Sequence, residues 1–152
     1  MTPVESATTK NILSALFRRK GKDGLYTRAF DSFGAWQQHQ FCWRLRLGKD
    51  ELPIIGSFED GDNWLVLTTE RLVWAIAGSR QQLRANAIDD AIMDLWEIRR
   101  SGIKKTEFRQ LQVVTMDGSK FVIEVEPGTP LIGVWHVLRN LGCRNRARAV
   151  RS

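Results

Sequence analysis

The sequence has few of the residues that support metal binding or cross-linking, and no long apolar run. Its two cysteines, Cys42 and Cys143, lie far apart without a Cys-x-x-Cys or Cys/His spacing, which argues against a metal site. The spacing leaves open whether they pair, and a reducing compartment would keep them as thiols. No stretch approaches the roughly 20 apolar residues of a membrane-spanning helix. A secretory signal pattern is also missing at the N-terminus, so we expect a cytoplasmic protein.

Motifs for nucleotide binding and acyl transfer are missing as well. The sequence contains no Gly-rich phosphate loop and no Gly-x-Ser-x-Gly. The two histidines, His39 and His136, have no Ser or Cys partner at motif spacing, and we interpret both as structural or exposed. We therefore expect a protein that is not an enzyme and that needs no cofactor or metal.

The acidic residues that could suggest catalysis are interpreted as structural. Asp89 and Asp90 fall at a predicted turn, where Asp accepts backbone hydrogen bonds. Segment 59–63 is acidic but lacks the spacing of a calcium loop, which predicts a solvated hairpin loop. Glu124 and Glu126 are expected on the outer face of one strand, and no sequence feature suggests a pocket around them.

The composition is that of an ordinary globular domain. The chain has 152 residues, of which 43% are hydrophobic and 26% charged, enough for one domain with its own core. The formal net charge of +6 comes from the two ends, because the first 28 and the last nine residues are basic while the middle is slightly acidic. Any binding to an anionic partner through net charge would therefore involve the ends.

The first third of the chain has helical patterns. Apolar residues at helical spacing predict a helix over 11–20, with Thr8 or Thr9 as its cap and Gly21 just beyond its basic end. Residues 29–47 fit either a helix or a strand, and we favour a helix for the first part.

Strand patterns dominate the middle of the chain. A run beside Pro53 predicts an edge strand over 54–58, because Pro is tolerated at sheet edges. Alternation or short apolar runs predict further strands at 64–68, 72–77, 83–87, 91–98, 108–115 and 120–126. The Asp117-Gly118 pair predicts a tight hairpin between the last two strands. In the last strand, Phe121, Ile123 and Val125 are expected to face the core.

A helix follows the strands. Thr129 as N-cap and Pro130 at the first helical position predict its start, and its apolar face up to Leu141 is expected to cover the sheet. We expect Gly133 to permit close packing against the sheet and Gly142 to end the helix. Residues 144–152 have no apolar pattern and are predicted to be disordered.

This order of elements resembles that of pleckstrin-homology-like (PH-like) domains. Residues 64–74, Trp-Leu-Val-Leu-Thr-Thr-Glu-Arg-Leu-Val-Trp, resemble the LTxxRL hairpin of bacterial PH-like and GRAM-like domains. The Ile-Asp-Asp at 88–90, the Asp117-Gly118 hairpin and the helix carrying Trp135 are similar to the rest of that pattern.

The resemblance covers about residues 52–142 and implies an α+β fold, a PH-like antiparallel β-barrel or sheet of six to seven strands capped by a C-terminal helix. It divides the chain into an N-terminal helical extension (1–50), a PH-like domain (51–143) and a basic tail (144–152). Well-known PH domains bind inositol phosphates through a basic loop between their first two strands. Here that loop corresponds to the acidic segment 59–63, which argues against phosphoinositide binding.

We expect the protein to bind another protein, and an immunity or inhibitor protein for a bacterial toxin is one example. Tryptophans are common at protein interfaces, so exposure of any of three indoles would support this function. The candidate contact residues are Trp36, Trp43 and Trp96.

Two alternatives rest on basic residues. The first is binding to anionic lipid through a basic loop together with the chain ends, with loop residues Arg99, Arg100, Lys104 and Lys105. The second is non-specific nucleic-acid binding through the C-terminal arginines Arg144, Arg146, Arg148 and Arg151. The sequence does not identify the partner or the oligomeric state.

Overall fold

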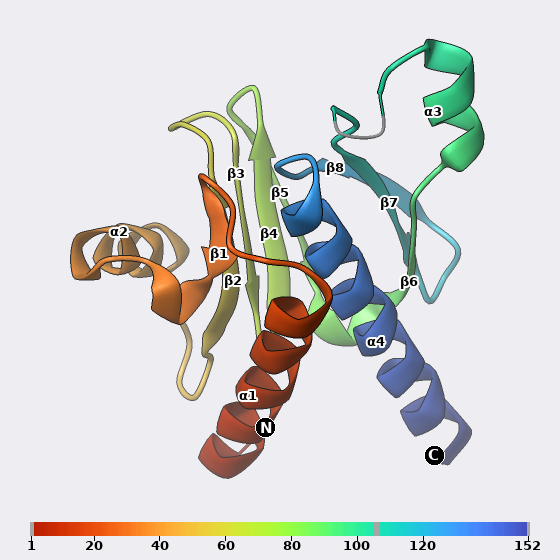
Figure 1. The fold of residues 1–152 in the computed structure, drawn as a ribbon. Coiled ribbons are helices and arrows are strands. Elements are labelled where there is room, and N and C mark those ends of the chain that lie inside the picture. Colours follow the sequence, from red (N-terminus) through yellow and green to blue (C-terminus); the bar gives the residue numbers. More distant parts are fainter. Residues whose placement is uncertain (1, 105–106, 152) are drawn as a thin grey trace.

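The computed structural model describes residues 2–104 and 107–151, in which eight strands form two antiparallel sheets (Figure 1). The five-stranded sheet follows chain order with β1 (Thr27–Ala29), β2 (Pro53–Phe58), β3 (Trp64–Thr68), β4 (Arg71–Ile76) and β5 (Ser79–Arg84). The three-stranded sheet contains β6 (Ile88–Ile92), β7 (Gln110–Thr115) and β8 (Lys120–Glu124). The helices are α1 (Pro3–Lys20), α2 (Ala35–Leu45), α3 (Leu95–Ser101) and α4 (Thr129–Arg151), with short 3₁₀ turns at η1 (Phe30–Ser32) and η2 (Ala85–Ala87).

The predicted α+β class, with antiparallel strands and a C-terminal helix, is confirmed. The strands do not close into a barrel, because β1 to β5 and β6 to β8 form separate sheets. In the described part of the chain, no helix is both long enough and apolar enough to cross a membrane.

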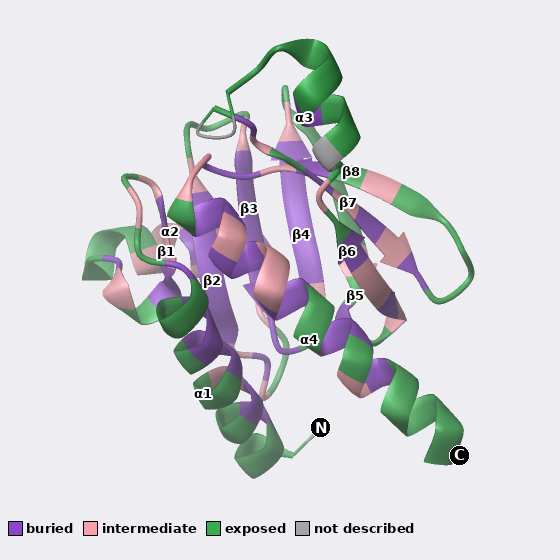
Figure 2. Ribbon diagram, turned by 45° about the vertical axis from the view of Figure 1, so that its right-hand side comes forward, coloured by how far each residue is buried: buried purple, intermediate pink, exposed green. Residues whose placement is uncertain are grey.

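The five-stranded sheet is covered on both faces (Figure 2). Leu65 and Leu72 point into a core shared with α1, α4 and the second sheet. Val66 and Val73 point the other way, into a second core beneath α2. Strands buried on both faces have continuous apolar runs instead of an alternating pattern, which explains the sequence of β3 and β4.

Helix α1 is longer than the sequence predicts. It begins at Pro3 with a capping box, in which the Thr2 side chain accepts from the Glu5 backbone N–H and Glu5 accepts from that of Thr2. The expected cap at Thr8 or Thr9 is therefore wrong, while the basic end at Lys20 is confirmed.

The end of α1 crosses the start of α4 at a close contact between glycines. A Cβ atom on Gly133 would lie 2.7 Å from the Phe17 ring, and one on Gly21 would lie 2.7 Å from the Gly133 Cα. Gly133 thus permits close packing, as expected, but against α1 instead of the sheet.

The ambiguous segment 29–47 contains a 3₁₀ turn followed by α2, so the strand alternative is wrong. Strand β1 precedes it and pairs with β2 in the register Thr27 to Ser57 and Ala29 to Ile55. Strand β2 is therefore internal, and its predicted edge position is also wrong. Pro53 is tolerated because it lies at the first residue of β2, outside the stretch paired with β1.

Between β5 and β7 the structure departs most from the prediction. The strand expected over 83–87 ends at Arg84, and the strand expected over 91–98 ends at Ile92. Helix α3 follows, because the Asp94 carboxylate accepts from the Glu97 N–H at 3.0 Å and caps it. Asp89 and Asp90 lie within β6 at an irregularity in its pairing with β7, instead of in the predicted turn.

The last hairpin agrees with the prediction except at its end. Gly118 has φ = +89°, as the Asp-Gly turn requires, and Ile123 and Val125 are buried. Glu126 is only 7% exposed instead of lying on the outer face. Its carboxylate accepts hydrogen bonds from the backbone N–H groups of residues 25–27 at 2.7 to 3.0 Å, so it attaches the N-terminal segment to the end of this sheet.

Helix α4 continues through Gly142 to Arg151, so the predicted helix end and the predicted disorder of 144–151 are wrong. The helix persists because it packs on β6: a Cβ on Gly142 would lie 1.9 Å from the Asp89 carbonyl oxygen. One turn further, the buried Asn145 amide donates to the carbonyls of Ala85 and Ile88, both at 2.8 Å. These contacts hold the last turns of α4 on β6, although the sequence has no apolar pattern there.

Candidate interaction surfaces

Helix α2 exposes two tryptophans on one face. Trp36 and Trp43 are 71% and 73% exposed, and a separation of seven residues places them on the same side of the helix, two turns apart. Phe41 and Leu45, on the opposite side, are buried in the second core. The helix is therefore anchored without either tryptophan. We call the exposed side, with Trp36, Gln40 and Trp43, the tryptophan face.

A hollow of about 400 Å³ adjoins the tryptophan face. It is lined by Trp36, Gln37, Gln40, Phe41 and Phe58. The Arg44 guanidinium lies over the Phe58 ring, 5.1 Å from its centroid. Helix α2 contains no Asp or Glu, so the surface combines apolar area with positive charge.

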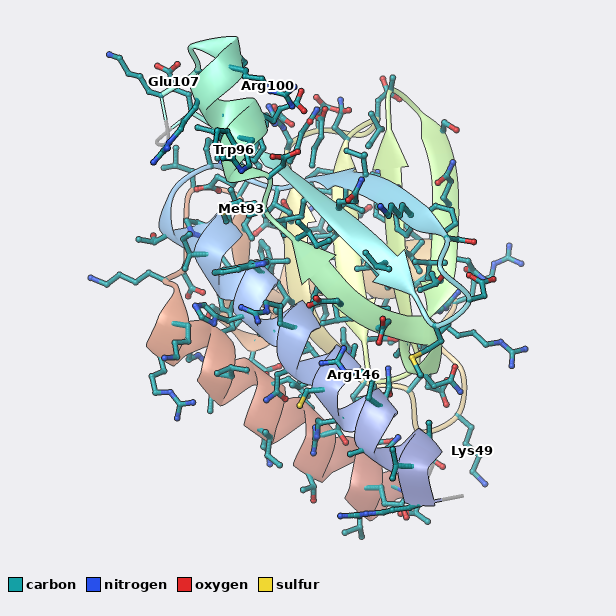
Figure 3. All side chains as sticks on the ribbon, turned by 90° about the vertical axis from the view of Figure 1, so that its right-hand side faces the viewer. Lys49, Met93, Trp96, Arg100, Glu107 and Arg146 are labelled. Carbon is teal, nitrogen blue, oxygen red and sulfur yellow. The ribbon has the colours of Figure 1, made fainter. Side chains whose placement is uncertain are left out.

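The third predicted tryptophan lies elsewhere. Trp96 is 71% exposed on α3, which stands on a different side of the molecule from α2 (Figures 1 and 2). Figure 3 shows Trp96 and Arg100 together on this helix. The structure thus exposes all three predicted tryptophans but brings only Trp36 and Trp43 into one surface.

The predicted basic loop is in fact helix α3 and the turn that follows it. Arg99, Arg100 and Lys104 are all exposed, and Arg100 lies 3.9 Å from Glu97. Lys105, the fourth predicted residue, lies outside the described residues. Arg99 and Arg100 therefore lie three and four positions after Trp96 on α3, and Lys104 follows the end of the helix.

The C-terminal arginines separate onto two sides of α4. Arg146 donates to the backbone carbonyl of Asp89 and to its carboxylate, the latter at 3.0 Å. Arg144 and Arg148, one turn apart, line a groove instead. Arg151 is exposed at the last residue of the helix. Only part of the predicted basic cluster is therefore oriented toward a common space.

That groove lies between the N-terminal part of α1 and the C-terminal part of α4, which diverge from their crossing (Figure 1). Its volume is about 750 Å³, and Arg84 from the end of β5 joins the two α4 arginines. We call it the arginine groove. It is lined by Glu5, Thr9, Thr69, Glu70, Arg71, Gln82, Arg84, Ala85, Asn86, Leu141, Arg144, Asn145 and Arg148.

A buried ion pair fixes one wall of the arginine groove. Arg71 donates through Nε to Glu51 at 2.8 Å and through Nη2 to the Leu45 carbonyl at 2.6 Å, at the end of α2. Burial raises the pKa of Glu51, but hydrogen bonds from Arg71, the Gly48 N–H and Thr68 outweigh it and leave this pKa below its ordinary value. Glu51 is thus ionised at neutral pH, and Arg71 is already paired.

Sequence reasoning missed Arg84 and the Glu51–Arg71 pair. No local motif marks them, because their partners come from distant segments. Helix α3 did carry a signal, since Asp94 and Glu97 have the spacing of a capping box.

The other candidate groups have structural surroundings. Burial lowers the pKa of His136, and the nearby cations Lys20 and Arg139 lower it further. Segment 59–63 is the predicted hairpin loop, in which Asp60 accepts from the N–H groups of Asp62 and Asn63. Over residues 2–104 and 107–151, no three His, Cys, Asp or Glu side chains gather as a metal site would require, and both cysteines are free thiols.

No protein-family model, curated protein or solved structure matches this chain. The class of the protein therefore rests on its fold, an α+β protein of two antiparallel sheets with a long C-terminal helix, and on its exposed surfaces.

Proposed function

We propose that the protein is a non-enzymatic binding module whose tryptophan face binds an acidic protein partner. The observation that carries this proposal is the pair Trp36 and Trp43, which expose most of their surface on one side of α2, with Trp36 lining a hollow. Tryptophan is the residue type most enriched among the side chains that dominate binding energy at protein interfaces. Because Phe41 and Leu45 anchor α2, the two indoles are free to contact a partner.

The positive charge near the tryptophan face indicates that the partner is acidic. Arg44, Arg46 and Lys49 lie at or beyond the end of α2 and outnumber Asp50 there, since Glu51 is paired with Arg71 and α2 itself contains no acid. A partner with carboxylates around an apolar side chain would match these cations and fill the hollow. An immunity or inhibitor protein for a bacterial toxin is one module of this kind, and a PH-like arrangement opened into two sheets is the scaffold we propose for it.

The surroundings of the carboxylates support a function without catalysis. Asp89 is paired with Arg146 at 3.0 Å and Asp90 with Arg139 at 3.6 Å. The Glu126 carboxylate accepts hydrogen bonds from the backbone N–H groups of Leu25 and Tyr26. Each of these acids has a structural partner, whereas a general acid or base needs access to a substrate.

The test compares the double substitution Trp36→Ser/Trp43→Ser with the single control Trp96→Ser. A partner captured from native lysate by the wild-type protein is identified, purified and titrated against each variant by calorimetry. We expect the double variant to lose about 100-fold in affinity, or about 3 kcal/mol, since truncation of one hot-spot residue costs about 2 kcal/mol and such losses do not fully add. Its melting temperature should stay near that of the wild type.

Salt supplies a second measurement, because charge complementarity predicts weaker binding as ionic strength rises. Unchanged affinity of the double variant would contradict the proposal, as would loss of binding through Trp96→Ser alone.

A second candidate function follows from α3. Trp96 projects there beside Arg99, Arg100 and Lys104, and an indole among cations suits the interface of an anionic membrane. We expect sedimentation with vesicles rich in phosphatidylserine, weakened by Trp96→Ser and by high salt but not by Trp36→Ser. Failure to bind such vesicles at low salt would remove this candidate.

A further inference from the structure

We propose that the arginine groove binds a small phosphorylated ligand. Three arginines converge on it from segments 60 or more positions apart: Arg84 ends β5, while Arg144 and Arg148 lie on one side of α4. Within the described part of the chain, none of the three forms an ion pair. These three arginines outnumber the two carboxylates on the lining, Glu5 and Glu70, and the resulting excess of positive charge raises the potential of the groove for anions.

Several other arginines of the molecule have carboxylate partners. Arg109 lies 2.6 Å from Glu59, Arg146 lies 3.0 Å from Asp89, and Arg71, on the wall of the groove itself, lies 2.8 Å from Glu51. The three groove arginines have no such ion pair among the described residues, although Glu5 and Glu70 also line the groove.

The groove is held in shape by buried contacts. Asn145 lies between Arg144 and Arg148 in the sequence, and its amide donates to carbonyls of Ala85 and Ile88. Ala85 directly follows Arg84, so the same hydrogen bonds fix α4 relative to the end of β5. The backbone from which the three arginines project is thus fixed, so that ligand binding needs to order only their side chains.

The chemistry of the lining indicates a phosphate ester. A guanidinium fork makes two parallel hydrogen bonds to phosphate oxygens, and more than one arginine can share a phosphoryl group. Glu70 and Asn86 are exposed on the same lining and can accept hydrogen bonds from hydroxyl or amino groups. The other glutamate, Glu5, is held in the capping box of α1. A sugar phosphate or nucleotide would use both kinds of group.

The size of the groove favours a small ligand over a nucleic acid. Its volume of about 750 Å³ lies within the range of small-molecule sites. Helices α1 and α4 border it on two sides, which limits the length of chain that could lie within it. The groove lies at the turn between β3 and β4 and at the end of β5, and neither Trp36 nor Trp43 lines it, so the tryptophan and arginine substitutions test the two proposals separately.

The test is calorimetric titration of the full chain at low salt with three probes: adenosine triphosphate, glucose 6-phosphate and inorganic phosphate. We expect the two esters to bind and to raise the melting temperature. Arg144→Gln/Arg148→Gln should weaken ester binding at least tenfold, and Arg84→Gln should weaken it as well. The matched control Arg18→Gln/Arg19→Gln removes the same two charges from the end of α1, outside the groove lining, and should bind like the wild type. Circular dichroism confirms that each variant is folded.

Two further arms define the source of the phosphate. Sedimentation with phosphatidic-acid vesicles that depends on Arg144 and Arg148 would assign the ester to a lipid headgroup, whereas binding of soluble esters alone would assign it to a free metabolite. If neither ester binds, or if the double variant binds as tightly as the wild type, the proposal is wrong. Binding of a single-stranded RNA together with no binding of either ester would overturn it in favour of nucleic acid.

Discussion

Helices α2 and α4 cover opposite faces of the five-stranded sheet, but they use tryptophan differently. On α4, Trp135 packs against the core and donates its indole N–H to the Ala91 carbonyl at 2.9 Å, with Arg139 over its ring. On α2, Trp36 and Trp43 remain mostly exposed. Core contacts and this hydrogen bond hold Trp135 in the fold, whereas the exposed area of Trp36 and Trp43 is available for binding.

The two helices also approach their sheets in different ways. Helix α4 contacts β6 backbone to backbone at Gly142, where no side chain separates them. Helix α2 is spaced from the sheet by aromatic rings, with Phe41 5.2 Å from Phe33 and 5.6 Å from Phe58 between centroids. Rings can rotate and shift, whereas a backbone contact cannot yield without moving a whole element. Substitutions should therefore affect the two sides unequally.

The largest effect is expected from Gly142→Ala. Its Cβ would lie 1.9 Å from a backbone oxygen, so α4 must move away from β6, at a cost of about 3 kcal/mol of unfolding free energy. Gly56→Ala, on the α2 side, meets the Phe33 ring at 2.9 Å and should cost about 1 kcal/mol because the ring can shift. Urea denaturation measures both.

Gly61→Ala is the control for these glycine substitutions, since nothing lies within 4 Å of its added Cβ. Equal losses for Gly142→Ala and Gly56→Ala would contradict the difference in packing that we describe.

The next largest difference is expected between Trp135→Ala and Trp43→Ala. Removing Trp135 leaves a gap beside the core and an unpaired Ala91 carbonyl, which should cost about 2 to 3 kcal/mol. Removing the exposed Trp43 should change the unfolding free energy by less than about 0.5 kcal/mol. Thermal and urea unfolding check this pair, and a large loss for Trp43→Ala would show that α2 needs its tryptophans for folding.

A smaller effect is expected on acidification. The folded-state pKa of Glu51 is lowered, so its contribution to stability is complete above the unfolded-state pKa, about 4.3, and is lost as the pH falls through the folded-state value. Because Arg71 joins Glu51 to the Leu45 carbonyl, α2 should loosen before α4 does.

Amide hydrogen exchange between pH 5 and pH 3 measures this loosening. Protection at the end of α2 should fall first, and the variant Glu51→Gln should show low protection there at every pH. Simultaneous loss of protection in α2 and α4 would mean that the ion pair does not act locally.

The smallest effect concerns α3, which belongs to neither covering layer. Asp94→Ala removes its N-cap and should cost about 1 kcal/mol or less, confined to this helix. The expected readout is faster hydrogen exchange in residues 95–101 with almost unchanged global unfolding. A global loss would show that α3 supports the second sheet.

Local signals predicted the elements in which neighbouring residues decide the conformation. The hairpin at Asp117-Gly118 requires a positive φ that Gly supplies, and Pro130 fits the first turn of a helix. The prediction was wrong where contacts with a distant segment of the chain decide the conformation. Gly142 is typical of a helix end, yet it remains helical because β6 passes at contact distance.

The candidate sites show the same division. The sequence suggested Trp36, Trp43 and Trp96 as contact residues, but only the structure shows that the first two share a face and that the third does not. It indicated a basic C-terminus as well. It could not indicate that Arg146 is paired with Asp89 while Arg144 and Arg148 face a groove.

By itself, the sequence determined the periodicity of the strands, the turns, the start of the last helix and the basic character of the ends, because each depends on residues within about one turn of one another. The tertiary structure alone decided which tryptophans stay exposed and that Arg84 meets Arg144 and Arg148. The burial of a side chain and the convergence of charged residues depend on how distant segments pack. The spacing of apolar residues within one segment does not reveal that packing.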